Sequence, residues 1–472
     1  MPALMVQGCT SWAGKSWLAT GLCRWFARQG VRVAPFKAQN MSNNARVLPD
    51  GGEIGAAQWL QAHAAGITPA ARMNPILIKP EATGSQVIRL GKLDPALSAR
   101  AWQQRSPQLW PTARTALDGL LADYELVVIE GAGSPAEINL ITHDITNMRV
   151  AAHADAPVLL VVDIDRGGAF AHLYGTWRLV GDDHRGRIAG FVLNRFRGDE
   201  TLLPPGPAQL EALTGVPTVG VIPMIDHDLP DEDGAALHRV PTRGGMPRVA
   251  VVRYPTASNL DELVTLEQVA DLRWATAPRH LSDVELIVLP GSKHVAADLA
   301  WLRTTGVDDA ITSAAGAGTR ILGICGGLQL LGRELVADAG IDGPGRGLGL
   351  LPLATRFGPD KRATPTATRF SARLSPPWEL LADRPVRGYE IRHGTTVAAD
   401  PHLVEALPAG LGWVRDNVLG VYVHGLLEDP DVVHALLGAR PARTLEDTFE
   451  RLADTIDAHL DTDLLRRLAR TR

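Results

Sequence analysis

The chain has 472 residues, more than one hydrophobic core normally accommodates, so two or three domains are expected. Its 45% hydrophobic and 21% charged residues are typical of soluble globular proteins, and a net charge of -5 argues against a nucleic-acid partner. No apolar run is long enough to cross a bilayer, no signal-peptide pattern is read, and three cysteines cannot form a disulfide framework, so we expect a cytoplasmic protein without a membrane span.

The first half of the chain alternates short apolar runs with helical stretches. A helix is expected over residues 16–29, and strands are expected over 3–7, 31–36, 126–129, 158–162, 188–193 and 219–222. These strands are rich in Val, Ile and Leu without alternation, as strands buried on both faces should be. The pattern predicts an α/β fold with a doubly wound parallel sheet.

A glycine-rich segment follows the first expected strand and precedes the first helix. It runs from Gly8 through Gly14, Lys15 and Ser16. Backbone N–H groups in such a loop bind phosphate, the lysine reaches the terminal phosphates and the hydroxyl binds Mg²⁺. Five residues separate the glycines instead of the usual four, which resembles the variant loop of dethiobiotin synthetase. The strand–loop–helix context favours an ATP site over an ordinary glycine-rich turn.

Polar residues also stand where later strands of this half end. Glu130 ends a buried strand and is predicted to hold a metal ion together with Ser16. Asp163 and Asp165 allow the same interpretation with less support. Asn194 ends another strand, where it could bind an adenine edge or cap a turn.

The pattern lapses over residues 226–246, which are acidic and then turn-rich, and we interpret this stretch as a linker. A second α/β domain follows, with strands expected over 249–252, 286–289, 321–324 and 421–423. Apolar residues at helical spacing from Leu445 to Leu460 predict a terminal amphipathic helix with a packing role. The expected divisions are 1–240, 247–435 and a helical extension over 440–472.

The second domain contains the cysteine form of a nucleophile elbow. Cys325 follows an apolar strand and is surrounded by glycines in a Gly-x-Cys-x-Gly pattern, with a helix after it. The small neighbours permit the sharp turn, the helix N-terminus favours a thiolate, and the N–H of Gly326 would bind an oxyanion. His424 is the favoured base. Gly291 is either the second oxyanion donor or part of a simple turn.

Several segments together resemble the CobB/CobQ family of glutamine amidotransferases, and within it the CobQ type. They lie at residues 35–41, 50–55, 73–75, 84–87, 130–139, 163–168, 194–199 and 388–391. The resemblance runs from the first strand to about Asp429. It implies amidation of the b, d, e and g carboxylates of adenosylcobyrinic acid a,c-diamide, a corrinoid, with glutamine, ATP and Mg²⁺. It also implies that Cys325 is the nucleophile, that His424 is its base, and that Lys15, Ser16 and Glu130 hold nucleotide and metal.

One departure concerns the acid that orients the catalytic histidine. Ordinary class I amidotransferases carry Glu two residues after this histidine, where the present chain has Leu426. The acid is therefore missing or comes from elsewhere, with Glu428 as one candidate. Alternatives for the whole chain are cobyrinic acid a,c-diamide synthesis, amidation of a cell-wall lipid precursor, or a regulatory P-loop ATPase. The last would not need a cysteine elbow with a histidine partner.

Overall fold

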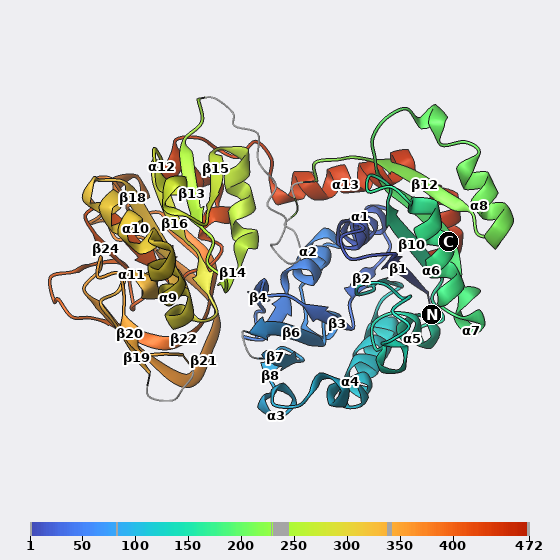
Figure 1. The fold of residues 1–472 in the computed structure, drawn as a ribbon, viewed down its shortest axis with the longest axis horizontal. Helices are drawn as coiled ribbons and strands as arrows, with labels where there is room; N and C mark the ends of the chain where they lie inside the picture. The colour runs from blue at the N-terminus through green and yellow to red at the C-terminus, as the bar shows by residue number, and fades with distance from the viewer. Residues whose placement is uncertain (1, 82–83, 228, 230–244, 338–341, 470–472) are drawn as a thin grey trace.

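The computed structural model describes residues 2–81, 84–227, 229, 245–337 and 342–469, which build two α/β units (Figure 1). The first unit is centred on a sheet in which every neighbouring pair is parallel. Its strands lie in the order β12 (Thr218–Pro223), β11 (Ile188–Phe196), β10 (Val158–Asp163), β1 (Ala3–Gly8), β9 (Leu126–Glu130), β2 (Val33–Phe36). The predicted doubly wound parallel fold is confirmed.

The central strands of this sheet are buried along their whole length. β1, β9 and β10 have no exposed position, because helices cover both faces of the sheet. Apolar β-branched residues suit such strands, which explains why the sequence identified them. The carboxyl ends of these strands meet at one edge, where α/β sheets place their ligands.

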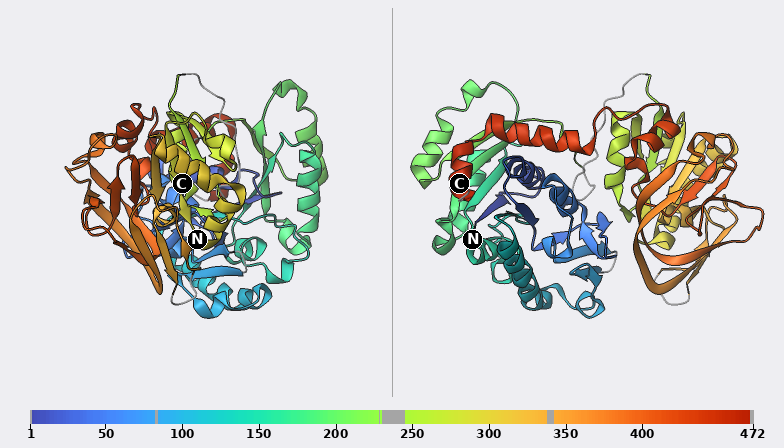
Figure 2. Two further views of the ribbon diagram at one scale, coloured as in Figure 1. Left: turned by 60° about the vertical axis from the view of Figure 1, so that its left-hand side comes forward. Right: turned by 180° about the vertical axis from the view of Figure 1, so that it is seen from behind.

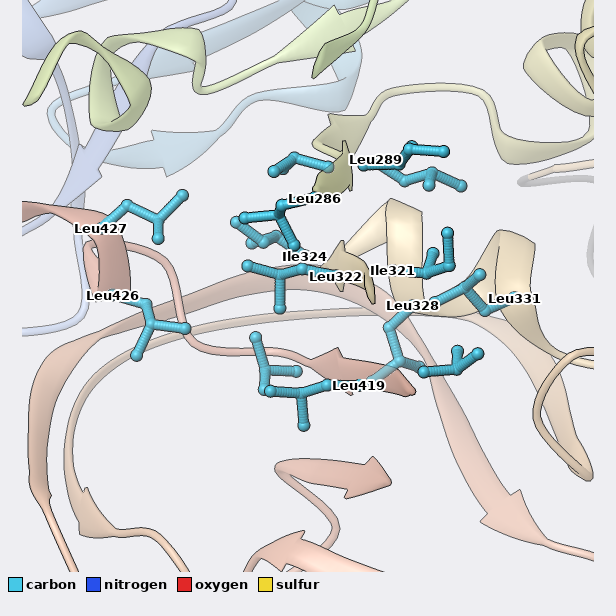
Figure 3. Close-up of a cluster of buried hydrophobic side chains, with 14 of the residues drawn as sticks. Leu286, Leu289, Ile321, Leu322, Ile324, Leu328, Leu331, Leu419, Leu426 and Leu427 are labelled. Atoms are coloured by element: carbon cyan, nitrogen blue, oxygen red, sulfur yellow. The ribbon is translucent and has the colours of Figure 1, made fainter. Parts of the chain in front are cut away.

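The second unit contains a mixed sheet of seven strands. Its order is β15 (Asp271–Ala275), β13 (Arg248–Val252), β16 (Leu286–Leu289), β18 (Arg320–Ile324), β25 (Val418–Val421), β24 (Gly412–Arg415), β23 (Val404–Leu407). The first five are parallel, and β24 and β23 extend the sheet in antiparallel fashion. Leucine and isoleucine side chains from β16, β18, β25 and α11 (Gly326–Leu331) form its core (Figure 3).

The last predicted strand of this unit is displaced. It was expected over residues 421–423, but β25 ends at Val421, where it pairs with Ile324 of β18. Tyr422 and Val423 leave the sheet, and His424 instead forms an isolated antiparallel bridge with Tyr389. The histidine is therefore held by a second segment of the chain, and not only by its own strand.

Antiparallel strands that the sequence did not predict bring the two units into contact. β4 (Ala45–Val47) pairs with β5 (Glu53–Gly55) in the first unit. The long strands β21 (Leu353–Arg369) and β22 (Pro385–Ala398) pair with each other in the second unit and lie against β4. The sequence missed them because they are short or polar, which hides the apolar pattern.

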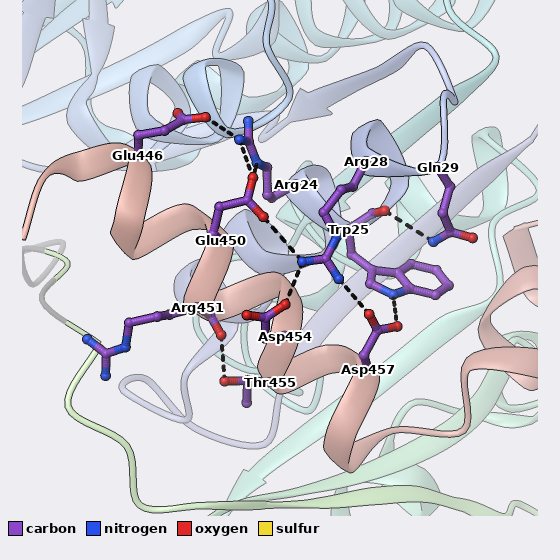
Figure 4. Close-up of polar contacts among 10 residues, drawn as sticks. All are labelled: Arg24, Trp25, Arg28, Gln29, Glu446, Glu450, Arg451, Asp454, Thr455 and Asp457. Carbon is purple, nitrogen blue, oxygen red and sulfur yellow. Dashed lines mark hydrogen bonds and ion pairs between the residues drawn. The ribbon is translucent and has the colours of Figure 1, made fainter.

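The C-terminal helices return to the first unit, as two further views also show (Figure 2). α13 (Leu445–His459) lies along α1 (Lys15–Arg28), and α14 (Thr462–Ala469) follows it. Phe449, Leu452 and Ile456 are buried in this contact, which agrees with the predicted packing role. Beside them, Arg24 and Arg28 of α1 pair with a row of acids on α13 (Figure 4).

Most of the predicted linker, over residues 226–246, lies outside the described residues. The limits expected for the three divisions therefore stay a prediction. No helix among the described residues has the length and apolar character needed to cross a membrane.

Candidate active sites

The phosphate loop lies between β1 and α1, as expected. Gly14 has φ of +101° immediately before α1, and a Cβ there would lie 2.1 Å from the Asn194 amide nitrogen, so only glycine fits. Lys15 is buried and its Nζ donates to the Thr10 carbonyl at 3.2 Å. The ammonium group thus lies folded back over the loop, where the sequence places the terminal phosphates.

Glu130 lies at the end of β9, fully buried beside the loop. Its Oε1 accepts hydrogen bonds from Ser16 Oγ at 2.7 Å and from Lys37 Nζ at 2.8 Å, while Oε2 accepts from Gln61 Nε2 at 2.6 Å. Burial opposes ionisation, but the Lys37 ammonium and these hydrogen bonds lower the pKa of Glu130. An ionised carboxylate is therefore kept next to Ser16. Sequence reasoning did not identify Lys37 or Gln61 as its partners.

The other strand-end residues have protein partners of their own. The Asn194 amide donates to the Ala13 carbonyl at 2.8 Å and so holds the phosphate loop. Its contact with adenine stays a prediction. Asp163 pairs with Arg195 at 3.1 Å, and Asp165 pairs with Arg197. These two acids are engaged in ion pairs at this edge of the sheet.

A cavity of about 910 Å³ opens at this edge and reaches the second unit. From the first unit, Lys15, Ser16 and Trp12 line it, and from the second unit Leu260 and Asp261 do so. It is large enough for a nucleotide and part of a second ligand. The described residues hold no group of three or more His, Cys, Asp and Glu side chains arranged as a metal site.

Cys325 occupies the predicted elbow between β18 and α11. Its φ is +53°, a positive value that is strained for a residue with a side chain. The close approach of glycine neighbours permits this turn: a Cβ at Gly327 would lie 1.9 Å from the Leu289 carbonyl oxygen. The sulfur is buried and lies 3.5 Å from the Ile391 carbonyl oxygen of β22.

The two predicted oxyanion glycines lie beside this cysteine. A Cβ at Gly326 would lie 2.5 Å from the backbone nitrogen of Ser292, and one at Gly291 would lie 3.2 Å from the His424 ring. Gly291 and Ser292 form β17, which pairs with Ala257 and Ser258 of β14. The structure thus brings Gly326, Gly291, Cys325 and His424 together, although their sequence positions span more than a hundred residues.

His424 contacts both a nucleophile and an acid. Its ring hydrogen-bonds the Cys325 side chain, and its Nδ1 lies 2.8 Å from Glu262 Oε1. The second oxygen of Glu262 accepts from the Gly425 N–H at 2.7 Å. Burial alone would lower the pKa of His424, but the Glu262 and Cys325 charges raise it to about 10. The imidazole therefore keeps its proton at neutral pH beside the sulfur.

Glu262 is the acid that the sequence could not locate, and the suggestion of Glu428 was wrong. Glu262 lies on η4 (Leu260–Gln268), which follows β14 (Ala257–Ser258), and is fully buried. Glu428 instead pairs with Arg46 of the first unit. The sequence around Glu262 gave little indication of this role, because η4 carries no recognisable motif. In the chain, 162 residues separate Glu262 from His424.

Comparisons with known proteins assign both units to a family. Residues 4–233 match the model of the CobQ/CobB/MinD/ParA nucleotide binding domain, and residues 248–432 match that of the CobB/CobQ-like glutamine amidotransferase domain. A cobyric acid synthase from Variovorax paradoxus is 55% identical, with 98% of each chain covered. One from Acidovorax ebreus is 54% identical, with 99% of each chain covered.

Proposed function

Since this chain belongs to the cobyric acid synthase family, we propose that it amidates the b, d, e and g carboxylates of adenosylcobyrinic acid a,c-diamide, using glutamine and ATP. The Cys325–His424–Glu262 arrangement is the observation that supports the glutamine half of this reaction most directly. The phosphate loop and the cavity that reaches the second unit support the ATP half.

In the glutaminase half, the Cys325 sulfur attacks the side-chain carboxamide of glutamine. The N–H groups of Gly326 and Gly291 hold the oxyanion that forms, which lowers the barrier to the tetrahedral intermediate. His424 gives its proton to the leaving nitrogen, so ammonia departs and a thioester remains. Water then hydrolyses the thioester to glutamate. Glu262 orients the imidazole throughout and stabilises its charge.

In the synthetase half, a carboxylate must first become a better electrophile. Transfer of the terminal phosphoryl group of ATP to a corrinoid carboxylate gives an acyl phosphate, and ammonia then displaces phosphate to form the amide. Lys15 and the loop N–H groups would bind the transferred phosphates. Ammonia released at Cys325 must reach this site unprotonated, because ammonium has no lone pair with which to attack.

Mg²⁺ would neutralise phosphate charge during the transfer. The residues fit this ion, because Mg²⁺ prefers oxygen ligands and completes its shell with phosphate oxygens and water. The Ser16 hydroxyl and the ionised Glu130 lie 2.7 Å apart at the loop. Ser16 and Glu130 would hold the ion, Ser16 through its hydroxyl and Glu130 through its carboxylate, directly or by way of a bound water.

Mass spectrometry of the corrinoid tests the proposal. Incubation of adenosylcobyrinic acid a,c-diamide with the protein, glutamine, ATP and Mg²⁺ should give stepwise conversion to a product with four new amides. Intact glutaminase activity without conversion would contradict the proposed substrate. Hydrolysis of ATP that responds to neither glutamine nor corrinoid would favour the regulatory ATPase.

Replacement of the nucleophile distinguishes the glutaminase reaction from the synthetase reaction. Cys325→Ala should abolish amidation with glutamine, because no thioester can form, and leave amidation with added ammonium salt at the wild-type level. The measurement is the rate of amide formation with each nitrogen source. Loss of both rates would show that Cys325 is needed for folding and not specifically for glutamine hydrolysis.

A further inference from the structure

A buried ion cluster joins the two units next to the glutaminase site. Arg46, on β4 of the first unit, pairs with Asp261 and Glu428 of the second unit. The side chains of Arg46 and Asp261 are only 5% and 1% exposed. A charge removed from water this completely must stay paired, so movement of one unit at this point has to be followed by the other.

Two short routes lead from Arg46 to His424. Along the chain, Asp261 is followed directly by Glu262, whose Oε1 lies 2.8 Å from Nδ1 of His424. Through space, the Arg46 guanidinium lies 5.6 Å from the centre of the Tyr389 ring, and that ring stacks on His424 at 5.3 Å with planes 19° apart. Both the acid and the aromatic face that fix the imidazole thus depend on where Arg46 lies.

On its other side Arg46 is connected to the nucleotide site. Its guanidinium lies 5.0 Å from the centre of the Trp59 ring on α2 (Ala56–Ala64). Gln61 of the same helix donates to Glu130 at 2.6 Å, and Glu130 accepts from Ser16 of the phosphate loop. A change at the loop when nucleotide binds therefore reaches Trp59 through a single helix.

The segment that carries Glu262 also borders the cavity directly. Leu260 and Asp261 line it together with Lys15 and Ser16, and the Leu260 N–H donates to Asn44 Oδ1 of the first unit at 3.2 Å. The ion cluster is not saturated: Arg46 Nε and Asp261 Oδ1 are buried without a hydrogen-bond partner among the described residues. An alternative pairing within the cluster therefore need not break every existing contact.

We propose that Arg46 is a positioning residue that transmits occupancy of the nucleotide cavity to His424, so that glutamine is hydrolysed rapidly only when an activated carboxylate can accept the ammonia. This inference rests on the proposed function. The coupling is a difference in free energy between two arrangements of the Arg46–Asp261–Glu262 connection, and ligand in the cavity favours the arrangement that aligns His424 with Cys325.

Glutaminase kinetics with and without the other substrates test this coupling. Glutamate release by the full-length protein is measured with glutamine alone and with ATP, Mg²⁺ and the corrinoid diamide added. Wild type should be stimulated, and Arg46→Met should reduce this stimulation by about tenfold, equivalent to about 1.4 kcal/mol in activation free energy. The loss should appear in kcat for glutamine and not in KM, since Arg46 does not contact the glutamine site.

Companion variants separate positioning from folding. Arg46→Lys keeps the charge and should restore part of the stimulation. Arg32→Met is the matched control, because Arg32 forms an exposed ion pair with Glu125 elsewhere in the first unit. If Arg46→Met unfolds, the nearly isosteric Asp261→Asn should reduce stimulation in the same way. Amidation with ammonium salt should stay at the wild-type level in the folded Arg46 variants, because Arg46 does not line the cavity.

Three results would overturn the inference. They are a wild type that is not stimulated, an Arg46→Met or Asp261→Asn variant that is stimulated normally, and an ammonium-supported rate that falls in parallel with glutaminase. Failure of the proposed function looks different, because wild-type protein would then amidate the corrinoid with neither glutamine nor ammonium.

Discussion

At the scale of single residues, the glutaminase site is held together by charge in a buried setting. Cys325, His424 and Glu262 are all buried, so Coulombic attraction between them is little screened by water. Burial by itself disfavours a charged imidazole, yet the two anionic neighbours raise the pKa of His424. The protonated imidazole is therefore stabilised by its neighbours, and loss of Glu262 should lower the pKa of His424.

Glu262→Gln should move the alkaline limit of glutaminase activity. His424 must be protonated to release ammonia, so wild-type kcat/KM for glutamine should stay high as pH rises and fall as it passes the raised pKa of about 10. A neutral amide removes the largest stabilising charge and cannot accept from the Gly425 N–H through its NH₂ group. We expect the limit to shift to lower pH, with kcat down by about tenfold or more.

The comparison variant is Glu428→Gln, which alters the other candidate acid. Glu428 pairs with Arg46, so its replacement should leave the alkaline limit in place. The measurement is the pH profile of glutamate release for the three proteins. Equal shifts in both variants would mean that the limit reports general charge around the site and not the Glu262–His424 contact.

At the scale of elements, the sequence predicted the features that depend on residues close together in the chain. The phosphate loop and the Cys325 elbow each lie within a strand, a turn and a helix, so glycine spacing was sufficient to identify them. Glu262 and Arg46 were missed because their roles come from contacts 162 residues and more than 200 residues away in the chain. The end of β25 at Val421 was misplaced because the next two residues, Tyr422 and Val423, are also apolar and buried although they lie outside the strand.

The contact between α1 and α13 allows apolar packing and ion pairing to be compared. Ile456→Ala removes a fully buried side chain and should lower the free energy of unfolding of the first unit by about 2–4 kcal/mol. Arg28→Ala breaks ion pairs whose acidic partners are 40% to 68% exposed, and should cost at most about 1 kcal/mol. Chemical denaturation at low and high salt measures both.

Salt separates the two contributions further. Raising the ionic strength should remove most of the difference between wild type and Arg28→Ala, because exposed charges are screened, and should leave the effect of Ile456→Ala unchanged. A larger loss in Arg28→Ala than in Ile456→Ala would show that ion pairs, and not burial, hold α13 in place.

At the scale of the whole molecule, the chain crosses between its two units and then returns. The amidotransferase unit is followed by α13, which lies on α1 of the first unit, so the second unit is tied to the first at both of its ends (Figure 1). α1 also begins at Lys15, so the same helix carries the proposed phosphate-binding lysine at one end and contacts α13 along its side. This arrangement makes the C-terminal segment part of the synthetase structure.

Removal of residues 440–472 should consequently damage the first unit selectively. Beyond α13, Leu460 forms a bridge with Gly220, and the Asp461 N–H donates to the Val219 carbonyl at 2.8 Å, so β12 loses contacts as well. The core of the second unit contains no residue of this segment. We expect a fall of about 5 °C or more in the first unfolding midpoint and loss of ammonium-supported amidation. Glutamate release without other substrates should persist, and its loss would show that the C-terminal helices also maintain the Cys325 site.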